Sequence, residues 1–154
     1  MADPTKTGQQ YPSFTWTVER EKIVELMRTI GDDNELFLDR DTARSEGYRD
    51  IPAPPTLITM PFCWNRLFPV IAADLDMDPA RILHGEENYQ YFEEIYPGDV
   101  LTGVLRITDV TEKSGKSGLM DVVRLQIVYR NQRSEIVMKV ETLLIERKQD
   151  RRPA

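Results

Sequence analysis

The sequence has 154 residues, a length typical of one domain with a single hydrophobic core. Its formal net charge of −6, from 26 acidic and 20 basic residues, argues against a nucleic-acid-binding protein, because such proteins present a basic surface. Cys63 is the only cysteine and His84 the only histidine, so an intrachain disulfide is excluded and no Cys/His pair has metal-ligand spacing. We therefore expect neither a metal site nor a bound cofactor.

Both ends of the sequence are polar, and this fixes the expected domain limits. Residues 1–12 and 148–154 are predicted to be flexible tails around one domain at 13–147. The chain begins without an apolar signal segment, and no apolar run reaches the ~18 residues of a membrane-spanning helix. We therefore expect a cytoplasmic protein that does not enter a membrane.

The first half of the domain is predicted to be mostly helical. A short strand is expected at 13–18, followed by an amphipathic helix at 19–30 that begins after Thr17 and ends at Gly31. A second short helix is expected at 39–46, capped by Asp39.

Prolines interrupt regular structure at 51–56, because each fixes φ and lacks an amide donor. The next segment, 57–75, is apolar on all sides. A helix of this kind is expected to be enclosed by other structure. Its cysteine, tryptophan and phenylalanine side chains are therefore predicted to be core residues.

The second half shows the alternation of β-strands, with predicted strands at 82–95, 99–113, 118–130 and 135–146. Turn-forming residues at 96–99, 114–118 and 131–134 separate them and predict hairpins. Hairpins build an antiparallel sheet, which needs one covered face. A curved antiparallel sheet wrapped around a long central helix is the α+β hot-dog fold, which we expect here.

The run Gly31-Asp32-Asp33-Asn34-Glu35-Leu36-Phe37-Leu38-Asp39 resembles the Gly-Asp-x-Asn-Pro-x-His-x-Asp signature of the MaoC-like (R)-specific enoyl-CoA hydratases. By this resemblance Asp32 and Asn34 are candidate catalytic residues, whereas Phe37 stands at the position of the catalytic histidine and Glu35 at that of a proline. Hydration of an enoyl thioester needs groups that accept and deliver protons, and a phenyl ring does neither. Read by itself, the run is also typical of an acidic turn that ends a helix.

Three further segments extend the resemblance over roughly residues 14–147: 47–56, 83–91 and 96–103. The order of the segments resembles the amino-terminal dehydratase type of the MaoC-like superfamily, which occurs in two-part hydratases. The resemblance implies that an acyl thioester is bound where two hot-dog units meet, with Pro54, Pro55 and Thr56 near its carbonyl. Pro55 replaces a glycine common in catalytic relatives and offers no N–H to an oxyanion.

His84 is expected to have a structural or interface role, since the family carries its catalytic histidine elsewhere. The resemblance implies a subunit of an (R)-specific 2-enoyl-CoA hydratase, or of the reverse 3-hydroxyacyl-CoA dehydratase, with acyl-CoA or an acyl-carrier thioester as substrate. A catalytically complete partner hot-dog would supply the Asp/His pair. A homodimeric acyl-CoA thioesterase using Asp32 or Asp39, and a non-catalytic acyl-thioester binding protein, are the alternatives.

Overall fold

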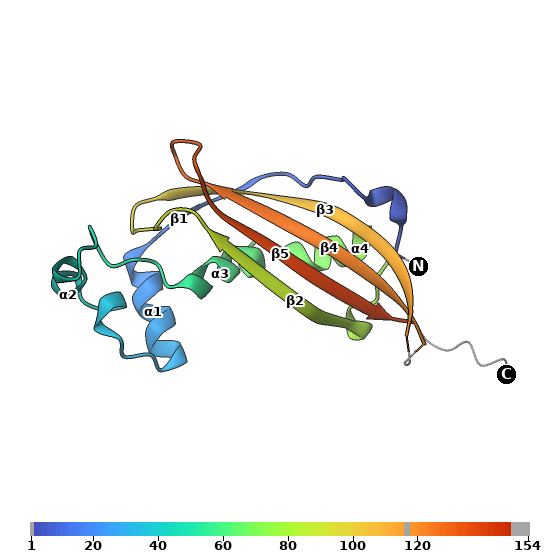
Figure 1. Ribbon diagram of the computed structural model, residues 1–154, viewed down its shortest axis with the longest axis horizontal. Helices are drawn as coiled ribbons and strands as arrows, with labels where there is room; N and C mark the ends of the chain where they lie inside the picture. Colours follow the sequence, from blue (N-terminus) through green and yellow to red (C-terminus); the bar gives the residue numbers. More distant parts are fainter. Residues whose placement is uncertain (1, 116–117, 149–154) are drawn as a thin grey trace.

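The computed structural model describes residues 2–115 and 118–148. In this part of the chain, antiparallel strands form one curved sheet in the order β1-β3-β4-β5-β2 (Figure 1). The strands are β1 (Phe14–Thr17), β2 (Ile82–Tyr91), β3 (Val100–Gly115), β4 (Gly118–Arg130) and β5 (Ile136–Arg147). The α-helices are α1 (Arg20–Ile30), α2 (Arg40–Ser45), α3 (Thr59–Trp64) and α4 (Leu67–Asp74). Short 3-10 turns are η1 (Pro4–Lys6), η2 (Glu35–Phe37), η3 (Pro55–Ile58) and η4 (Pro79–Arg81).

Helices α3 and α4 lie along one face of the sheet, while α1 and α2 stand beyond one end of it (Figure 1). This arrangement confirms the predicted α+β hot-dog fold. Helix α1 ends as predicted at Gly31, which has φ 72°. Asp39 caps α2 as predicted, its side chain accepting from the Thr42 amide at 2.7 Å. None of the helices in the described ranges is long and apolar enough to cross a membrane.

The central helix is broken rather than continuous over 57–75. Pro69 has no N–H to donate to the carbonyl of Asn65, and its ring crowds that carbonyl, so a helix cannot run through this point undisturbed. The chain breaks at Asn65 and Arg66, and Arg66 takes the left-handed conformation with φ 51°. The prediction that this helical segment is enclosed on all sides was also wrong, since Cys63 and Trp64 are exposed.

The predicted hairpin between the strands at 82–95 and 99–113 is wrong. Strand β2 ends at Tyr91 and pairs with β5 at one edge of the sheet, whereas β3 pairs with β1 near the opposite edge. The Gly98 amide donates to the Val18 carbonyl at 2.8 Å, which ties the intervening turn to the end of β1. Alternation identified the strands, but it does not specify which strand pairs with which.

Residues 2–12 do not form the predicted flexible tail. The N-terminal strap, which we define as residues 2–11, runs along β3, where the amides of Gly8 and Tyr11 donate to the carbonyls of Ile107 and Leu105 at 2.8 and 2.9 Å. Ala2 is 1% exposed. Polar composition suggested a tail, but backbone pairing with a strand edge needs no apolar side chains. Of the second predicted tail, only Lys148 lies within the described residues.

The carboxylate of Asp74 fastens the strap to the rest of the fold. Asp74, at the end of α4, accepts hydrogen bonds from Lys6 Nζ and Gln9 Nε2 at 2.7 Å and from Tyr11 Oη at 2.8 Å. The Lys6 ammonium, then the Tyr11 hydroxyl, lowers the pKa of Asp74. The single Asp74 carboxylate thus holds three residues of the strap.

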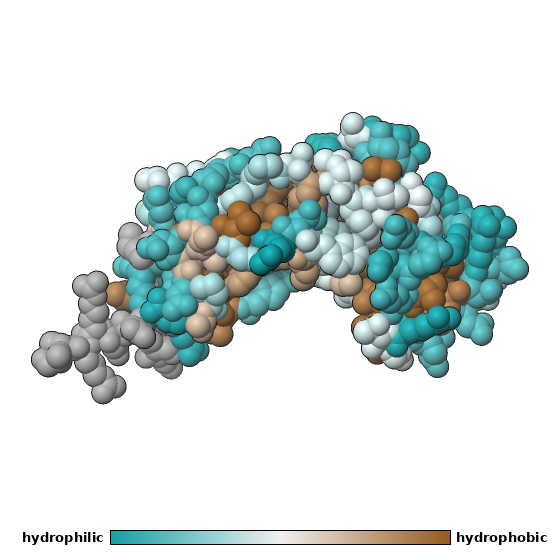
Figure 2. Space-filling view, turned by 180° about the vertical axis from the view of Figure 1, so that it is seen from behind, coloured by the Kyte–Doolittle hydropathy of each residue, from teal (hydrophilic) through white to brown (hydrophobic). Residues whose placement is uncertain are grey.

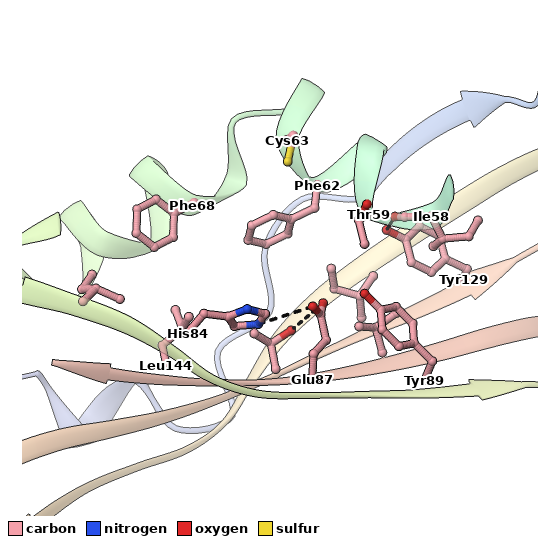
Figure 3. Close-up of a pocket in the computed structure, with 14 residues that line it drawn as sticks. Ile58, Thr59, Phe62, Cys63, Phe68, His84, Glu87, Tyr89, Tyr129 and Leu144 are labelled. Atoms are coloured by element: carbon pink, nitrogen blue, oxygen red, sulfur yellow. Dashed lines mark hydrogen bonds and ion pairs between the residues drawn. The ribbon is translucent and has the colours of Figure 1, made fainter. Parts of the chain in front are cut away.

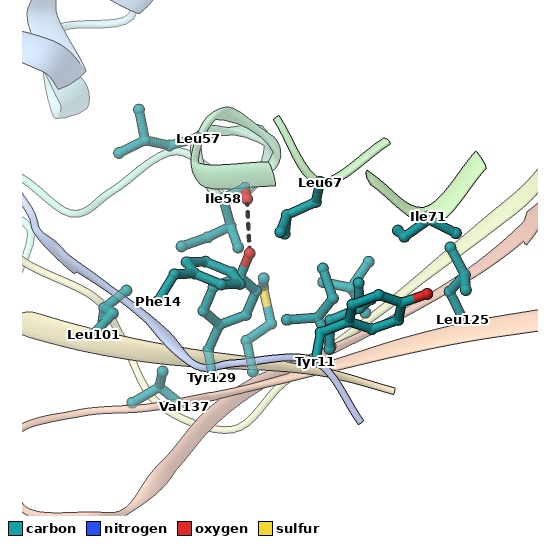
Figure 4. Packing of buried hydrophobic residues seen from close by; sticks show 14 of the residues in the cluster. Tyr11, Phe14, Leu57, Ile58, Leu67, Ile71, Leu101, Leu125, Tyr129 and Val137 are labelled. Atoms are coloured by element: carbon teal, nitrogen blue, oxygen red, sulfur yellow. Dashed lines mark hydrogen bonds between the residues drawn. The ribbon is translucent and has the colours of Figure 1, made fainter. Parts of the chain in front are cut away.

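A close approach at Gly103 organises the core between three strands. Gly103 pairs with Phe14 on β1 and with Tyr129 on β4, and the two rings meet edge to face at 5.9 Å over it (Figure 4). A Cβ at Gly103 would lie 2.4 Å from Phe14 Cζ and 2.9 Å from Tyr129 Cε1. Only glycine therefore fits between the two aromatic rings.

Gly103→Ala should lower the free energy of unfolding by about 1–3 kcal/mol, because the new methyl group displaces two packed rings. Thr15→Ala, an exposed position on β1, is the control and should cost less than about 1 kcal/mol. Urea unfolding of both variants measures the difference. Equal losses in the two variants would contradict the role given to Gly103.

The Asp74 cluster should make stability depend on acid pH. Because folding lowers the pKa of Asp74, its contribution is present above the unfolded value of about 3.9 and is lost as the pH falls through the folded value. The stability difference between wild type and Asp74→Asn should therefore shrink as the pH is lowered from about 5 to about 2. Urea unfolding across this range, with Asp33→Asn as an exposed control, tests this; a constant difference would contradict it.

Candidate functional site

An apolar pocket of about 320 Å³ lies between the broken central helix and the sheet (Figure 3). Pockets of this size, mainly apolar with a few polar groups, are typical binding sites for small molecules. Its walls come from η3, α3 and α4 on one side and from β2, β4 and β5 on the other. The lining residues are Ile58, Thr59, Phe62, Cys63, Phe68, Ile82, His84, Glu87, Tyr89, Ile127, Tyr129, Val140, Thr142 and Leu144.

The helix break gives the pocket two separate aromatic groups. Phe62 comes from α3 and Phe68 from α4, and both face the β2 and β5 wall (Figure 3). Leu67 and Ile71, by contrast, are buried in the core. The two short helices thus fill the core at some positions and leave an open space over the sheet at others.

A β-bulge on β2 determines which side chains face the pocket. In a regular strand, His84 and Glu87 would lie on opposite faces, because side chains alternate. The register shifts between His84 and Glu86, with Gly85 as the extra residue. Beyond the bulge, Glu87 and Tyr89 face the pocket together with His84.

His84 and Glu87 form a polar cluster with two neighbours, Tyr89 and Thr142. His84 Nε2 lies 3.4 Å from Glu87 Oε2, and Thr142 Oγ1 donates a long hydrogen bond of 3.5 Å to Glu87 Oε1. Burial raises the pKa of the Tyr89 phenol, and the negative charge of Glu87 raises it further. We refer to His84, Glu87, Tyr89 and Thr142 as the polar cluster of the pocket.

Tyr129 connects the pocket to the core. Its side chain is 1% exposed, and its hydroxyl donates to the Ile58 carbonyl at 3.4 Å (Figure 4). Burial raises the pKa of this phenol, so it remains a neutral donor. Tyr129 thereby fixes the start of the central helix above the sheet.

The residues predicted to be catalytic lie outside the pocket lining. Asp32 and Asn34 are exposed, and each side chain accepts a hydrogen bond at 3.0 Å from the amide two residues further along, in Asn34 and Leu36 respectively. Both therefore shape their own turn, as Asx residues do. Phe37 is half-buried and packs against the core. Their catalytic assignments stay predictions.

Two of the three predicted substrate-binding residues border a second pocket, of about 350 Å³. Pro54 and Pro55 line it, and it shares Ile58 with the apolar pocket. Tyr91 donates to the Pro55 carbonyl at 3.2 Å, which places the end of β2 beside these prolines. Thr56 is exposed, and its carbonyl accepts a hydrogen bond from Thr59 Oγ1 at 2.8 Å.

Two of the quoted sequence segments, 47–56 and 96–103, meet in the fold. Both carboxylate oxygens of Asp99 lie 2.9 Å from Arg49 Nη2, and the guanidinium also lies 4.2 Å from the centre of the Tyr96 ring. The Ala53 amide donates to the Ile95 carbonyl at 2.7 Å. These contacts hold the proline segment at the entrance to the central helix.

The polar cluster was missed by the sequence analysis, which gave His84 a structural or interface role. A signal was present: a glycine inside a strand pattern often marks a bulge, and a bulge at Gly85 changes which residues share a face. The pairing of Glu87 with Thr142 on β5 could not be read from the sequence, since it depends on strand order.

Comparisons with known proteins agree with this architecture. A family model described as "FAS1-like, dehydratase domain region" matches residues 5–140. A UPF0336 protein of Saccharopolyspora erythraea is 31% identical over 126 residues, covering 81% of this chain and 80% of that protein.

Two solved structures have the same fold. A chain of the HadBC (3R-hydroxyacyl-ACP dehydratase) complex of Mycobacterium tuberculosis is 25% identical with a TM-score of 0.76, covering 91% of this chain and 96% of that one. A MaoC-like dehydratase from Rhodospirillum rubrum is 19% identical with a TM-score of 0.65, covering 93% and 94%. The chain therefore belongs to the FAS1-like dehydratase region family, and it has the same hot-dog fold as the MaoC-like dehydratase.

Proposed function

We propose that this chain is the substrate-binding subunit of an (R)-specific 2-enoyl-CoA hydratase, or of the reverse 3-hydroxyacyl-CoA dehydratase. It holds the acyl thioester, and a partner hot-dog supplies the Asp/His pair. The observation that carries the proposal is the apolar pocket under the central helix in a chain of a dehydratase family.

The pocket is suited to an acyl chain. Its volume is about 320 Å³. A methylene group occupies a volume similar to the ~30 Å³ of a water molecule, so the pocket has room for on the order of ten methylene groups. Burial of each methylene contributes about 0.8 kcal/mol. The thioester end would lie at the second pocket, beside Pro54 and Pro55, and the chain would pass Ile58 into the apolar pocket.

The loop at 31–39 supports a division of labour between two subunits. Phe37 stands where the resembled motif has its histidine, and it offers no group for proton transfer. Asp32 and Asn34 are occupied with local hydrogen bonds. A similar chain occurs in the HadBC complex of Mycobacterium tuberculosis, a 3R-hydroxyacyl-ACP dehydratase.

The surface offers a place for a partner. Among the described residues, strand β2 has a neighbouring strand on one side only, and a free strand edge of ten residues is normally paired or covered. Exposed apolar side chains lie on β2 and the central helix, namely Leu83, Tyr91, Trp64 and Val70, with Phe92 just beyond β2. Figure 2 shows apolar residues among hydrophilic ones near the middle of one face, and a second apolar area at the end away from the grey trace. Such a surface is typical of a protein interface.

The thioesterase alternative with Asp32 or Asp39 draws no support from the geometry. It requires a carboxylate free to activate water, whereas Asp39 caps α2, and its hydrogen bonds with the amide and side chain of Thr42 lower its pKa. Asp32 caps its own turn. The remaining alternative, a non-catalytic thioester binder, differs from the proposal only in the activity of the assembled complex.

Acyl-chain binding can be tested with neighbouring leucines on opposite faces of β5. Leu144 lines the apolar pocket, whereas Leu143 lies on the other face of the sheet. Leu144→Phe should weaken binding of decanoyl-CoA at least roughly tenfold, equivalent to ~1.4 kcal/mol, because the ring occupies the acyl space. Leu143→Phe should leave affinity within about twofold. Calorimetric titration of both folded variants with decanoyl-CoA measures the two affinities. Equal affinities would show that the acyl chain does not bind in this pocket.

The purified chain alone should show little or no hydration of crotonyl-CoA or longer trans-2-enoyl-CoAs, because Phe37 cannot transfer a proton. It should sediment as a dimer or with a co-purified partner, and activity should appear with a hot-dog partner that carries an intact Asp-x-Asn-x-x-His motif. The readout is loss of enoyl thioester absorbance. Turnover by the chain alone that His84→Ala abolishes would place the base in this chain instead.

A further inference from the structure

The polar cluster is the one part of the pocket that a plain hydrocarbon chain would not use. We propose that it recognises a hydroxyl group carried on the acyl chain, at a position remote from the thioester. This inference rests on the proposed function, since it takes the same pocket to be the acyl site. It adds a substrate class, namely acyl thioesters that carry a hydroxyl group far from the thioester carbon.

The cluster would be unfavourable beside a ligand that is only hydrocarbon. Placing a carboxylate against an apolar ligand removes water from the charge without a replacement hydrogen bond. Only a quarter of the Glu87 side chain, 26%, remains exposed before any ligand enters. A plain acyl chain packed between Phe62 and the β2 wall would cover that remainder and leave the carboxylate further desolvated.

The bulge directs His84 to this wall. Regular pairing of β2 with β5 would put His84 and Glu87 on opposite faces of the sheet. The bulge at Gly85 interrupts this pairing by one residue. A Cβ at Gly85 would lie 2.9 Å from Ile145 Cδ1, so a larger residue does not fit without movement. The strand thus places an imidazole and a carboxylate side by side over an apolar space.

The donors and acceptors of the cluster match a hydroxyl group. The carboxylate of Glu87 only accepts, so a ligand atom bound to it must donate. The imidazole of His84 and the phenol of Tyr89 can donate, so the same ligand atom can also accept. A hydroxyl oxygen both donates and accepts, whereas a methylene does neither.

The fold also sets the distance of this hydroxyl from the thioester. Tyr91 touches the Pro55 carbonyl, where the thioester is proposed to lie, and Glu87 faces the pocket four residues earlier on β2. At ~3.3 Å per residue, the backbones of the two residues are about 13 Å apart, which places the cluster away from the thioester end of the pocket. Carbon 10, the far end of a ten-carbon chain, is therefore the position to probe.

Three acyl-CoA probes of equal chain length separate the inference from the proposed function: decanoyl-CoA, 10-hydroxydecanoyl-CoA and 5-hydroxydecanoyl-CoA. The full-length wild-type protein should bind the 10-hydroxy probe at least about tenfold more tightly than decanoyl-CoA, and more tightly than the 5-hydroxy probe. Equal affinity for all three would overturn this inference and leave the acyl site in place. No binding of any probe would overturn the proposed function and, with it, the inference.

Glu87→Met removes the acceptor and keeps the length of the side chain. It should abolish the preference for the 10-hydroxy probe, while decanoyl-CoA binds as well as or better than to wild type. Glu86→Met, on the outer face of the same strand, is the matched control and should keep the preference. His84→Phe is a second variant, which should reduce the preference. Retention of the full preference in both Glu87→Met and His84→Phe would overturn the assignment of the cluster.

Discussion

The contact that the rest of this structure depends on is the packing of Phe14 and Tyr129 over Gly103. It sets the separation of β1, β3 and β4 at one point, because no side chain fits beneath the two rings. Tyr129 extends the same constraint to the helical layer through its hydroxyl and the Ile58 carbonyl. The sheet, the start of the central helix and one wall of the pocket therefore share a single buried side chain.

The pocket follows from the way the central helix is broken. Pro69 prevents one continuous helix, and the left-handed Arg66 turns the chain between two short helices. A continuous helix would present one apolar stripe to the sheet, whereas two short helices can bury Leu67 and Ile71 and still hold Phe62 and Phe68 above an open space. Local backbone chemistry in this segment thus determines where a ligand can fit.

Most elements could be predicted from the sequence, because local signals mark them. Gly31 and Asp39 show their helix-ending and capping roles directly, and alternation identifies the long strands. Strand order, the packed N-terminal strap and the pairing of Glu87 with Thr142 depend on contacts distant in the chain. The alternation of apolar and polar residues along a strand carries no information on these distant contacts. The turn at 96–99 illustrates this, since its residues are typical of a hairpin although it leads to the opposite side of the sheet.

The N-terminal strap has a consequence for how chains can associate. Together with β1, it covers the outer edge of β3 as far as Ile107, and beyond that point β3 carries the charged residues Asp109, Glu112 and Lys113. Charged side chains on a strand edge discourage further pairing. In the described part of the chain, this leaves the β2 edge as the place where another strand could be added to the sheet. Removal of the strap would therefore expose a second strand edge to pairing with another chain.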